Sequence, residues 1–446
     1  MTKFIGNIMS DLSTEPEDFK ERFIPIGKQE IVADLLAEPH WTPDQHQQFS
    51  DFCNLFTALY HYKFHKHLED LKRYYHPFNP DTDIVTKRDY YKEEKQKFHH
   101  QLVAEVRQLL NNANYEELTI ADINRAMTAG SYYGVEVEVD LDDFAEIVVY
   151  YRGLSTQVEY KRSWTSRFLF KKPLETPIYN RLFLLLKFKT EEDRVKEWIT
   201  VKGSEFEKTA RRRVRKSRQN LPESLKEEHV FLKLFKNIPR SDLEMLFPNQ
   251  NVRLKLFDKI KLALSGGGGT IFGIISIVGK IGAAVVNPVG LAGAFAGLIG
   301  IIFRQIMSIF TQRTKYMMTL SRNLYFLNLD NNFGVMNYLI DMAEEEEGKE
   351  AILAYYFLHT QSSKNYTKNM LDQKIESYIK EKYGIAIDFE VDDGLRKLRE
   401  EGLLMEQEGV LKVLSLHEAC ACLDKQWDNF FNPQEGDLDW GKFKNT

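Results

Sequence analysis

The sequence predicts an α+β protein with a two-helix membrane hairpin, and three observations lead to this expectation. Apolar residues recur at helical spacing through most of residues 1–130. Short β-branched and aromatic runs bounded by turn residues follow between 131 and 262. An apolar segment, residues 270–303, then contains Lys280 as its only charged residue. A run of that length and composition is typical of membrane-spanning helices.

The composition fits a chain of several globular domains. Its 446 residues are 43% hydrophobic and 28% charged, which allows a sizeable core. The net charge of −5 gives no general attraction for nucleic acid or anionic lipid, so such binding would need a local basic patch. The three cysteines, Cys53, Cys420 and Cys422, lack disulfide-framework spacing and suit a reducing compartment. The acidic N-terminus has no long apolar stretch and predicts no signal or transit peptide.

The first two predicted regions are helical and then sheet-forming. In the N-terminal helical region, 1–130, a long helix is expected to end near Pro77, because proline interrupts helices. Residues 131–262 predict a mixed or antiparallel sheet of about four or five strands. The strand candidates are residues 135–139, 145–153, 167–172, 180–189 and 229–238. The charged insert 190–228 is expected to be a helix or a mobile arm.

Residues 263–312 form the predicted transmembrane hairpin. A single helix over 270–303 would be about 50 Å long, against about 30 Å of hydrocarbon in a bilayer. Asn287-Pro288 near the middle is a turn signal, so two helices over about 270–286 and 289–310 are expected. Small residues would let these helices approach closely, namely Gly279, Gly293 and Gly297. The alternative is a buried helical hairpin in a soluble core.

Lys280 and the flanking charges indicate how the hairpin would lie. Lys280 is costly at a bilayer centre, but it lies near the turn, where its side chain can reach the interface. Basic residues stand on both sides, with Arg253 and Lys255 before the hairpin and Arg304 and Arg313 after it. Because basic flanks stay in the cytoplasm, both soluble parts are expected there.

The C-terminal third predicts a connector and a second small domain. The helical connector, 313–348, ends in the acidic run Glu344–Glu347, which we interpret as a linker. Helical patterns followed by two short strands give 349–431 the order of a winged-helix-like domain. Its third helix has four acids against three bases, so a protein partner is favoured over DNA. Residues 432–446 are expected to be disordered.

Six basic residues in the charged insert are the main binding candidate. They are Arg211, Arg212, Arg213, Arg215, Lys216 and Arg218. In a membrane-anchored chain they would contact phosphate groups of anionic lipids, and a solvated charged helix is the alternative.

Metal-binding candidates are weaker. Carboxylates of the kind that bind divalent cations are Asp81, Asp83, Asp242 and Glu244, and turn or capping roles are the alternative. Softer ligands, at His61, His65, His67, His417, Cys420 and Cys422, complete no metal-binding motif. The alternative for the first three is an aromatic, polar helix face, and for the last three it is buried thiols that pack the last helix. No P-loop, GxGxxG, GxSxG or kinase motif is present, so the sequence identifies neither a reaction nor a cofactor.

Several motifs resemble one uncharacterised family. They are RFIPI (22–26), YHPFNPD (75–81), VVYYRG (148–153), YNRLFLLLKFK (179–189) and LKLFKNIPRSDLEMLFPN (232–249). In this order, over residues 20–345, they resemble the family of the domain of unknown function 3754, which includes a mitochondrial transmembrane protein of eukaryotes. The resemblance implies a soluble region followed by a membrane hairpin. It attaches no role to the matching residues Pro77, Phe78, Asp81, Arg152, Gly153, Pro239, Asp242 and Glu244.

Three functional hypotheses follow. The first is a membrane-anchored binding or scaffold protein that faces the cytoplasm. Its partners would be the lipid bilayer, a protein bound through the C-terminal domain, or a second copy of the chain. The second is a membrane-bound metal-dependent enzyme that uses the loop carboxylates. The third is a tethered nucleic-acid binder, which the charge balance disfavours. The lack of a transit peptide favours a bacterial-type cytoplasmic membrane over a mitochondrial membrane.

Overall fold

The computed structural model describes most of the chain, which divides into two compact units. The described residues are 20–81, 90–128, 136–162, 171–218, 221, 227–249, 251–253, 324–361 and 366–430, with single positions between 307 and 322. Unit 1 comprises Met1–Pro77, Thr86–Glu116 and Phe333–Thr446, and unit 2 comprises Phe78–Val85 and Glu117–Asn332. The combination of many helices with an antiparallel sheet confirms the predicted α+β class.

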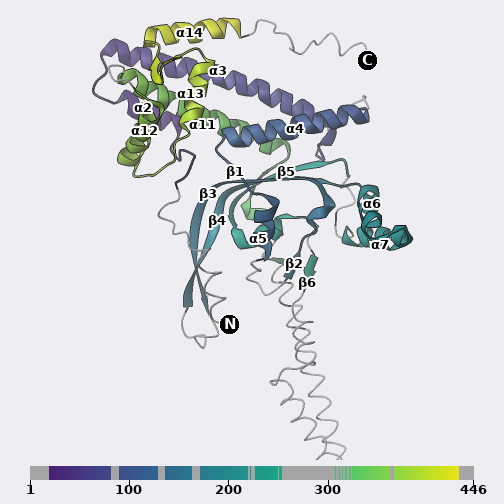
Figure 1. Ribbon diagram of the computed structural model, residues 1–446. Helices are drawn as coiled ribbons and strands as arrows, with labels where there is room; N and C mark the ends of the chain where they lie inside the picture. Colours follow the sequence, from purple (N-terminus) through teal and green to yellow (C-terminus); the bar gives the residue numbers. More distant parts are fainter. Residues whose placement is uncertain are drawn as a thin grey trace, which may run out of the picture. The chain divides into compact units, whose positions relative to one another are not determined.

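Unit 1 is built from helices that come from both ends of the chain (Figure 1). Its helices are α2 (Lys28–Leu36), α3 (Pro43–Tyr75), α4 (Lys92–Asn112), α11 (Phe333–Thr360), α12 (Lys368–Tyr383), α13 (Val391–Glu400) and α14 (Leu416–Asn429). The strands β8 (Leu404–Gln407) and β9 (Val410–Val413) pair as an antiparallel hairpin. Helices followed by a hairpin agree with the order expected for 349–431, and the winged-helix-like assignment stays a prediction.

Local sequence signals set the start of α3. The Thr42 hydroxyl accepts a hydrogen bond from the backbone N–H of Gln45, and the Gln45 side chain accepts one from the backbone N–H of Thr42. This capping box satisfies two N–H groups that a helix start would leave unpaired. One face of α3 buries an aromatic stripe, in which Phe52 stacks on Tyr355 of α11 with 4.0 Å between ring centroids. The predicted long helix is therefore present, and its apolar face packs in the core.

Helix α11 corrects the interpretation of Glu344–Glu347 as a linker. The helix runs unbroken through residues 348 and 349, where the sequence suggested a boundary, and 19 of its 28 residues are buried. Carboxylates are rarely buried unless a cation or hydrogen-bond donor meets them, so an acidic run normally indicates a solvated segment. Here the partners lie far away in the sequence, and the run belongs to the interior of unit 1.

Ion pairs and backbone groups neutralise the buried charges of α11. Lys349 Nζ lies 2.8 Å from Glu346 Oε1 and donates to the Ile24 carbonyl oxygen at 2.6 Å. The N–H of Ile24 donates in turn to Glu346 Oε2 at 3.1 Å. Further along the helix, Lys397 of α13 donates to Glu350 at 2.5 Å, and neither side chain is more than 1% exposed. These contacts connect α11 to the segment before α2 and to α13.

In unit 2 the described strands form a five-stranded sheet in the order β1-β3-β4-β5-β7. The strands are β1 (Glu116–Glu117), β3 (Phe144–Arg162), β4 (Lys171–Phe188), β5 (Val230–Pro239) and β7 (Asn328–Asn331). Pairing from β3 through β7 is antiparallel throughout. The strand predicted at 180–189 is the second half of β4. The run predicted at 135–139 contains β2 (Glu136–Glu138), which pairs separately with β6 (Asn251–Arg253).

One face of this sheet carries the core of unit 2. Alternate residues of β4 point into it, because side chains on a strand alternate between the two faces. They pack against α5 (Ile120–Thr128) and the 3-10 helix η5 (Arg240–Leu246), and Figure 1 shows α5 below the curved strands. The central residues of this core are Leu182, Leu184, Leu186, Phe235, Leu243 and Phe247.

Gly153 gives a structural reason for one sequence motif, VVYYRG. Its φ is +79°, and a Cβ at this position would lie 2.7 Å from Nδ2 of Asn180. The β3–β4 register passes from the pair Arg152–Arg181 to the pair Leu154–Tyr179, so Gly153 has no assigned partner. A residue with a side chain would be strained there by both backbone and neighbour.

The predicted membrane hairpin lies outside the described residues. This applies to every residue singled out in it, namely Gly279, Lys280, Asn287, Pro288, Gly293 and Gly297, and also to the tail 432–446. Among the helices that the structure describes, none is long and apolar enough to cross a membrane. The hairpin therefore stays a prediction from the sequence.

The Lys397–Glu350 pair is expected to behave as a unit in unfolding. Replacing either partner alone, as Lys397→Met or Glu350→Leu, leaves the other charge buried and should destabilise unit 1 by about 3–5 kcal/mol. The double variant removes both charges and should recover most of that loss. Hydrogen–deuterium exchange of the α11 amides in increasing urea measures this free energy within unit 1. If the double variant lost as much unfolding free energy as the two single variants together, the two side chains would not be energetically coupled.

Candidate functional site

The basic residues singled out in the sequence lie on the second helix of a pair in unit 2, with Arg218 at the C-cap of that helix. Helix α6 (Glu191–Lys202) begins after the N-cap Thr190, and α7 (Glu207–Ser217) follows it after a short 3-10 turn. The described part of the charged insert as far as Ser217 is therefore mainly helical, which was one of the two predicted alternatives. A small apolar cluster joins the two helices, formed by Val195, Ala210 and Val214.

Two of the arginines on α7 form exposed ion pairs. Arg211 pairs with Glu207 one turn earlier, with 3.0 Å between Nη2 and Oε1. Arg215 Nε donates to Glu191 of α6 at 2.9 Å. Exposed pairs of this kind contribute little to stability and exchange readily for other partners. These two side chains remain accessible to an external anion.

Two other arginines contribute to the structure of the unit. Arg218 Nη2 donates to Asp143 at 2.6 Å and to the Lys189 carbonyl oxygen at 2.9 Å, and its side chain is 15% exposed. The Arg213 guanidinium lies 4.6 Å from the Trp198 ring centroid, a cation–π contact. Arg218 therefore holds the end of α7 against the sheet and has little surface left for a ligand.

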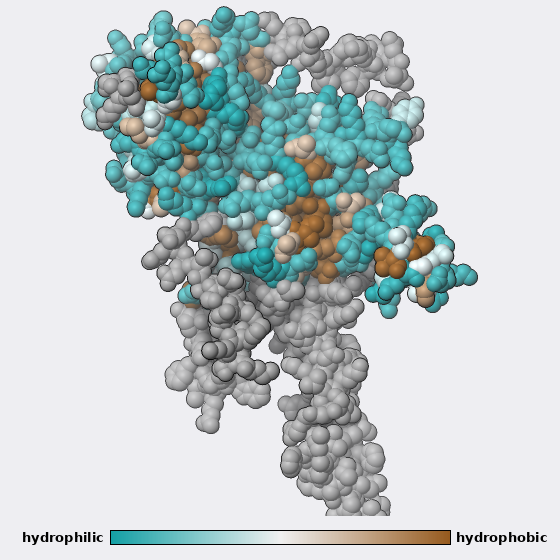
Figure 2. All heavy atoms as spheres, in the orientation of Figure 1, coloured by the Kyte–Doolittle hydropathy of each residue, from teal (hydrophilic) through white to brown (hydrophobic). Residues whose placement is uncertain are grey.

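Arg212 and Lys216 are the exposed cations that remain. They lie one helical turn apart on α7 and form no ion pair within the described part of the chain. Apolar side chains are exposed next to this helix, with Val201 77% and Phe206 48% exposed. Figure 2 shows hydrophobic side chains among hydrophilic ones over α6 and α7. Cations beside exposed apolar groups are the composition of an element that binds at a membrane interface.

The four predicted metal-binding carboxylates do not form one group in the described residues. Asp83 lies outside them, and Asp81 accepts a hydrogen bond from the Asn332 side chain. Asp242 and Glu244 lie on η5 and are 6% and 3% exposed. No three His, Cys, Asp or Glu residues among those described are close enough together to hold a metal ion.

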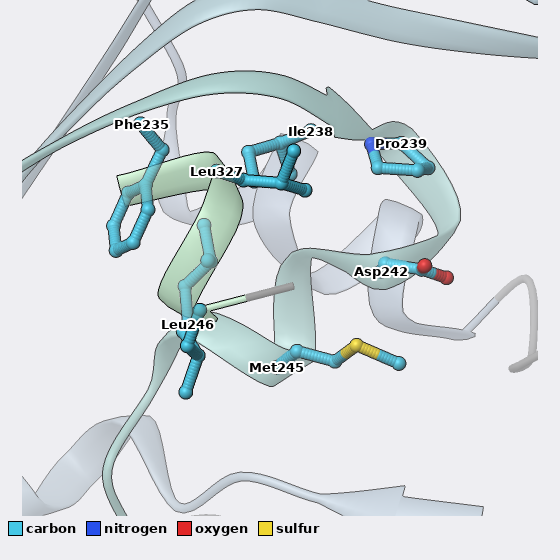
Figure 3. Close-up of a pocket in the computed structure, with 8 residues that line it drawn as sticks. Phe235, Ile238, Pro239, Asp242, Met245, Leu246 and Leu327 are labelled. Carbon is cyan, nitrogen blue, oxygen red and sulfur yellow. The ribbon is translucent and has the colours of Figure 1, made fainter. Parts of the chain in front are cut away.

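Asp242 lines a small apolar pocket in unit 2 (Figure 3). The other residues that line it are apolar, namely Phe235, Ile238, Pro239, Met245, Leu246, Leu324 and Leu327. The free volume is about 10 Å³, which holds one water molecule at most. The pocket is therefore a gap in packing and has no room for a substrate.

The candidate histidines lie at exposed helix positions of unit 1, and the cysteines are buried or half-buried there. His61 Nδ1 lies 3.1 Å from Glu344 of α11. Cys53 is buried, while Cys420 and Cys422 each donate to a backbone carbonyl oxygen. The cysteine contacts fit the packing alternative, and the exposed histidines fit a polar helix face.

A charged cleft in unit 1 was not recognised from the sequence. Four residues of α3, from Tyr60 to His67, and four of α4, from Glu105 to Asn112, line it at the spacing i, i+3, i+4 and i+7. Glu347 of α11 and residues at the end of α13 complete it, and the free volume is about 190 Å³. The signal for this cleft in the sequence was the polar residues that recur at the same helical spacing on α3 and α4. Only the packing of the helices shows that the two sets face the same space.

Three ion pairs line this cleft. Lys63 of α3 pairs with Glu401, which follows α13. His67 Nδ1 lies 3.6 Å from Glu105 of α4, and this neighbouring carboxylate raises the pKa of His67. On α13, Arg396 lies 3.2 Å from Glu400. The cleft is thus a polar site between helices, and His67 is the residue in it that the sequence analysis had named as a candidate ligand.

Glu244 is an ionisable group buried without full compensation. Its Oε2 has no hydrogen-bond partner in the described part of the chain. Burial raises the pKa of Glu244 from 4.5 to about 7. The folded state therefore binds the proton more tightly than the unfolded state, and stability must fall as pH rises through 7.

The variant Glu244→Gln is expected to remove this pH dependence. Glutamine mimics the protonated carboxyl, so the variant should match the wild type near pH 4.5 and exceed its stability by up to about 3 kcal/mol at pH 8. Thermal unfolding of unit 2 at both pH values tests this. Glu205→Gln removes an exposed carboxylate and serves as the control. An unchanged pH dependence in Glu244→Gln would show that another group titrates.

The comparisons with known proteins concern the central part of the chain. No solved structure matches the chain. The predicted resemblance extended over 20–345, and the match is narrower, since it begins with β3 and ends at the start of α11. Residues 144–334 match the model of a family described as a protein of unknown function (DUF3754).

Proposed function

We propose that this protein is a membrane-anchored binding protein whose soluble parts face the cytoplasm. The observation that carries the proposal is the segment 270–303, in which Lys280 is the only charged residue. A turn signal divides the segment, and basic residues stand on both sides of it, so a hairpin that returns to the same side is favoured. A bacterial-type cytoplasmic membrane is the proposed location, with a mitochondrial membrane as the alternative.

The exposed face of α7 supports contact with anionic lipid headgroups. Arg212 and Lys216 have no internal counter-ion in the described residues, and apolar surface is exposed at Phe206, which precedes α7, and at Val201 on α6. A basic residue close to an anionic membrane surface contributes about 1 kcal/mol of attraction. Apolar side chains at the same surface add to it by entering the interface. The α6–α7 pair would therefore hold unit 2 against the membrane in which the hairpin is anchored.

The basic residues of α13 favour this proposal over a nucleic-acid binder. Lys397 is fully buried against Glu350. Arg396 and Arg399 both lie within 3.3 Å of neighbouring carboxylates. Because α13 carries three acids for its three bases, it has no net positive charge to attract the phosphates of a nucleic acid. A protein partner for this surface remains part of the proposal.

Cysteine labelling tests the hairpin. In a chain whose Cys53, Cys420 and Cys422 are replaced, we introduce Ser265→Cys or Val289→Cys and express each in a bacterial membrane. A maleimide that cannot cross membranes should label position 265 from the cytoplasmic side of vesicles, and should label position 289 only from the other side. The reason is that the turn would have crossed the bilayer while the flank had not.

The parent without cysteines measures background labelling in this experiment, and detergent-solubilised protein should label at both positions. If position 289 is labelled from the cytoplasmic side as readily as 265, the spanning hairpin is wrong, and the alternative of a buried soluble hairpin is favoured.

Hydrogen–deuterium exchange tests the lipid contact of α7. In nanodiscs that contain phosphatidylserine, the amides of Glu207–Ser217 should exchange more slowly than in phosphatidylcholine nanodiscs. Arg212→Gln with Lys216→Gln should abolish the difference, because about 2 kcal/mol of attraction is lost. The matched control, Lys196→Gln with Lys202→Gln on α6, should retain it.

Equal exchange of α7 in the two lipids would contradict the headgroup contact. A separate measurement with duplex DNA at low salt distinguishes the nucleic-acid alternative. Binding that weakens steeply with salt and depends on Arg212 and Lys216 would favour that alternative over the lipid surface.

A further inference from the structure

The charged cleft of unit 1 carries an excess of acid. Four carboxylates line it, from Glu105, Glu347, Glu400 and Glu401, against the two permanent cations Lys63 and Arg396. The cleft therefore has an excess of two negative charges when His67 is neutral, and of one when it is protonated. Such a site attracts cations and repels anions.

Glu347 is the carboxylate in this cleft that lacks a donor. It is 5% exposed, and its nearest cation is Arg396, whose Nη2 lies 4.0 Å away. No hydrogen bond from the described part of the chain reaches it, whereas its neighbour Glu346 accepts from both Lys349 and Ile24. Burial raises the pKa of Glu347, as expected for a carboxylate with incomplete compensation. A donor from outside the protein would satisfy this group.

Glu401 supplies a second incomplete acceptor at the same cleft. Its side chain is 1% exposed, and Lys63 donates to Oε1. Its other oxygen, Oε2, has no hydrogen-bond partner among the described groups. A buried carboxylate oxygen without a donor is unfavourable by about 1–3 kcal/mol. Glu347 on α11 and Glu401 just after α13 are therefore two carboxylates of this cleft that are not fully satisfied within the described part of the chain.

The remaining wall of the cleft suits the carbon chain of a ligand. Tyr60, Phe64 and Leu109 provide apolar surface between the charged groups. The Tyr60 ring already receives an ammonium group, since Lys63 Nζ lies 5.4 Å from its centroid. The free volume of about 190 Å³ is more than ten times the roughly 10–15 Å³ that one water needs. The space suits a chain of a few methylene groups with charged ends.

We propose that this cleft binds a small aliphatic amine with one or two ammonium groups, and that Glu347 is its principal acceptor. An ammonium offers three donors, and a primary amine can satisfy Glu347 while its stem lies against Tyr60 and Phe64. A second ammonium neutralises the remaining excess charge near the mouth of the cleft, where Glu400 is more exposed. A divalent metal is disfavoured, because the described residues contain no group of three metal-binding side chains.

Isothermal titration calorimetry on the full chain in a non-ionic detergent tests this proposal, with 1,4-diaminobutane as the probe. The diamine should bind, and the neutral analogue 1,4-butanediol should not. Glu347→Gln keeps the shape of the side chain and removes its charge, so it should weaken binding by about 10- to 100-fold. Glu344→Gln, on the same helix but outside the cleft, should bind like the wild type.

A second variant protects the test against a folding defect. Glu400→Gln lies at the exposed rim and should weaken binding by about two- to fivefold. Absence of binding to the wild type, equal binding of the diol, or unchanged affinity in both Glu347→Gln and Glu400→Gln would overturn the proposal. Tighter binding of Mg²⁺ or Ca²⁺ than of the diamine, lost in Glu347→Gln, would also overturn it in favour of a metal site.

Discussion

The fold of unit 1 depends on how the charges of α11 are neutralised. A helix enclosed by protein cannot keep its carboxylates ionised unless a cation or a donor meets each of them. Lys349 and the Ile24 backbone meet Glu346, and Lys397 meets Glu350. Because these partners come from the segment before α2 and from α13, the contacts that permit burial of α11 also position its neighbours.

The same helix directs one acidic run toward several different partners. Successive residues of a helix point about 100° apart, so four adjacent carboxylates cannot share one environment. Glu344 pairs with a histidine of α3, and Glu345 pairs with a lysine of α2. Glu346 is satisfied inside the core, and Glu347 reaches the charged cleft. Helical geometry thus places a fully satisfied acid next to one that still has acceptor capacity.

In unit 2 the sheet supports a helical pair whose basic residues divide into structural and exposed groups. Arg218 is held by Asp143, and Arg213 covers Trp198, so both help to fix the position of α7. Arg212 and Lys216 then lie on the opposite, solvated side of the helix. Some basic residues of this run therefore stabilise the position of α7, and the others remain available to bind an anionic surface.

The sequence by itself determined those features whose causes lie within a few residues. A capping box places the start of α3, and β-branched runs predict β3 and β5. The apolar composition of 270–303 predicts a hairpin in the same local way, and that hairpin stays a prediction. Only the tertiary structure decided which charges are buried, because their partners are distant in the sequence. Lys397 is 47 residues away from Glu350, and Ile24 is 322 residues away from Glu346. The cleft belongs to this second class, since it exists only where α3, α4, α11 and the end of α13 meet.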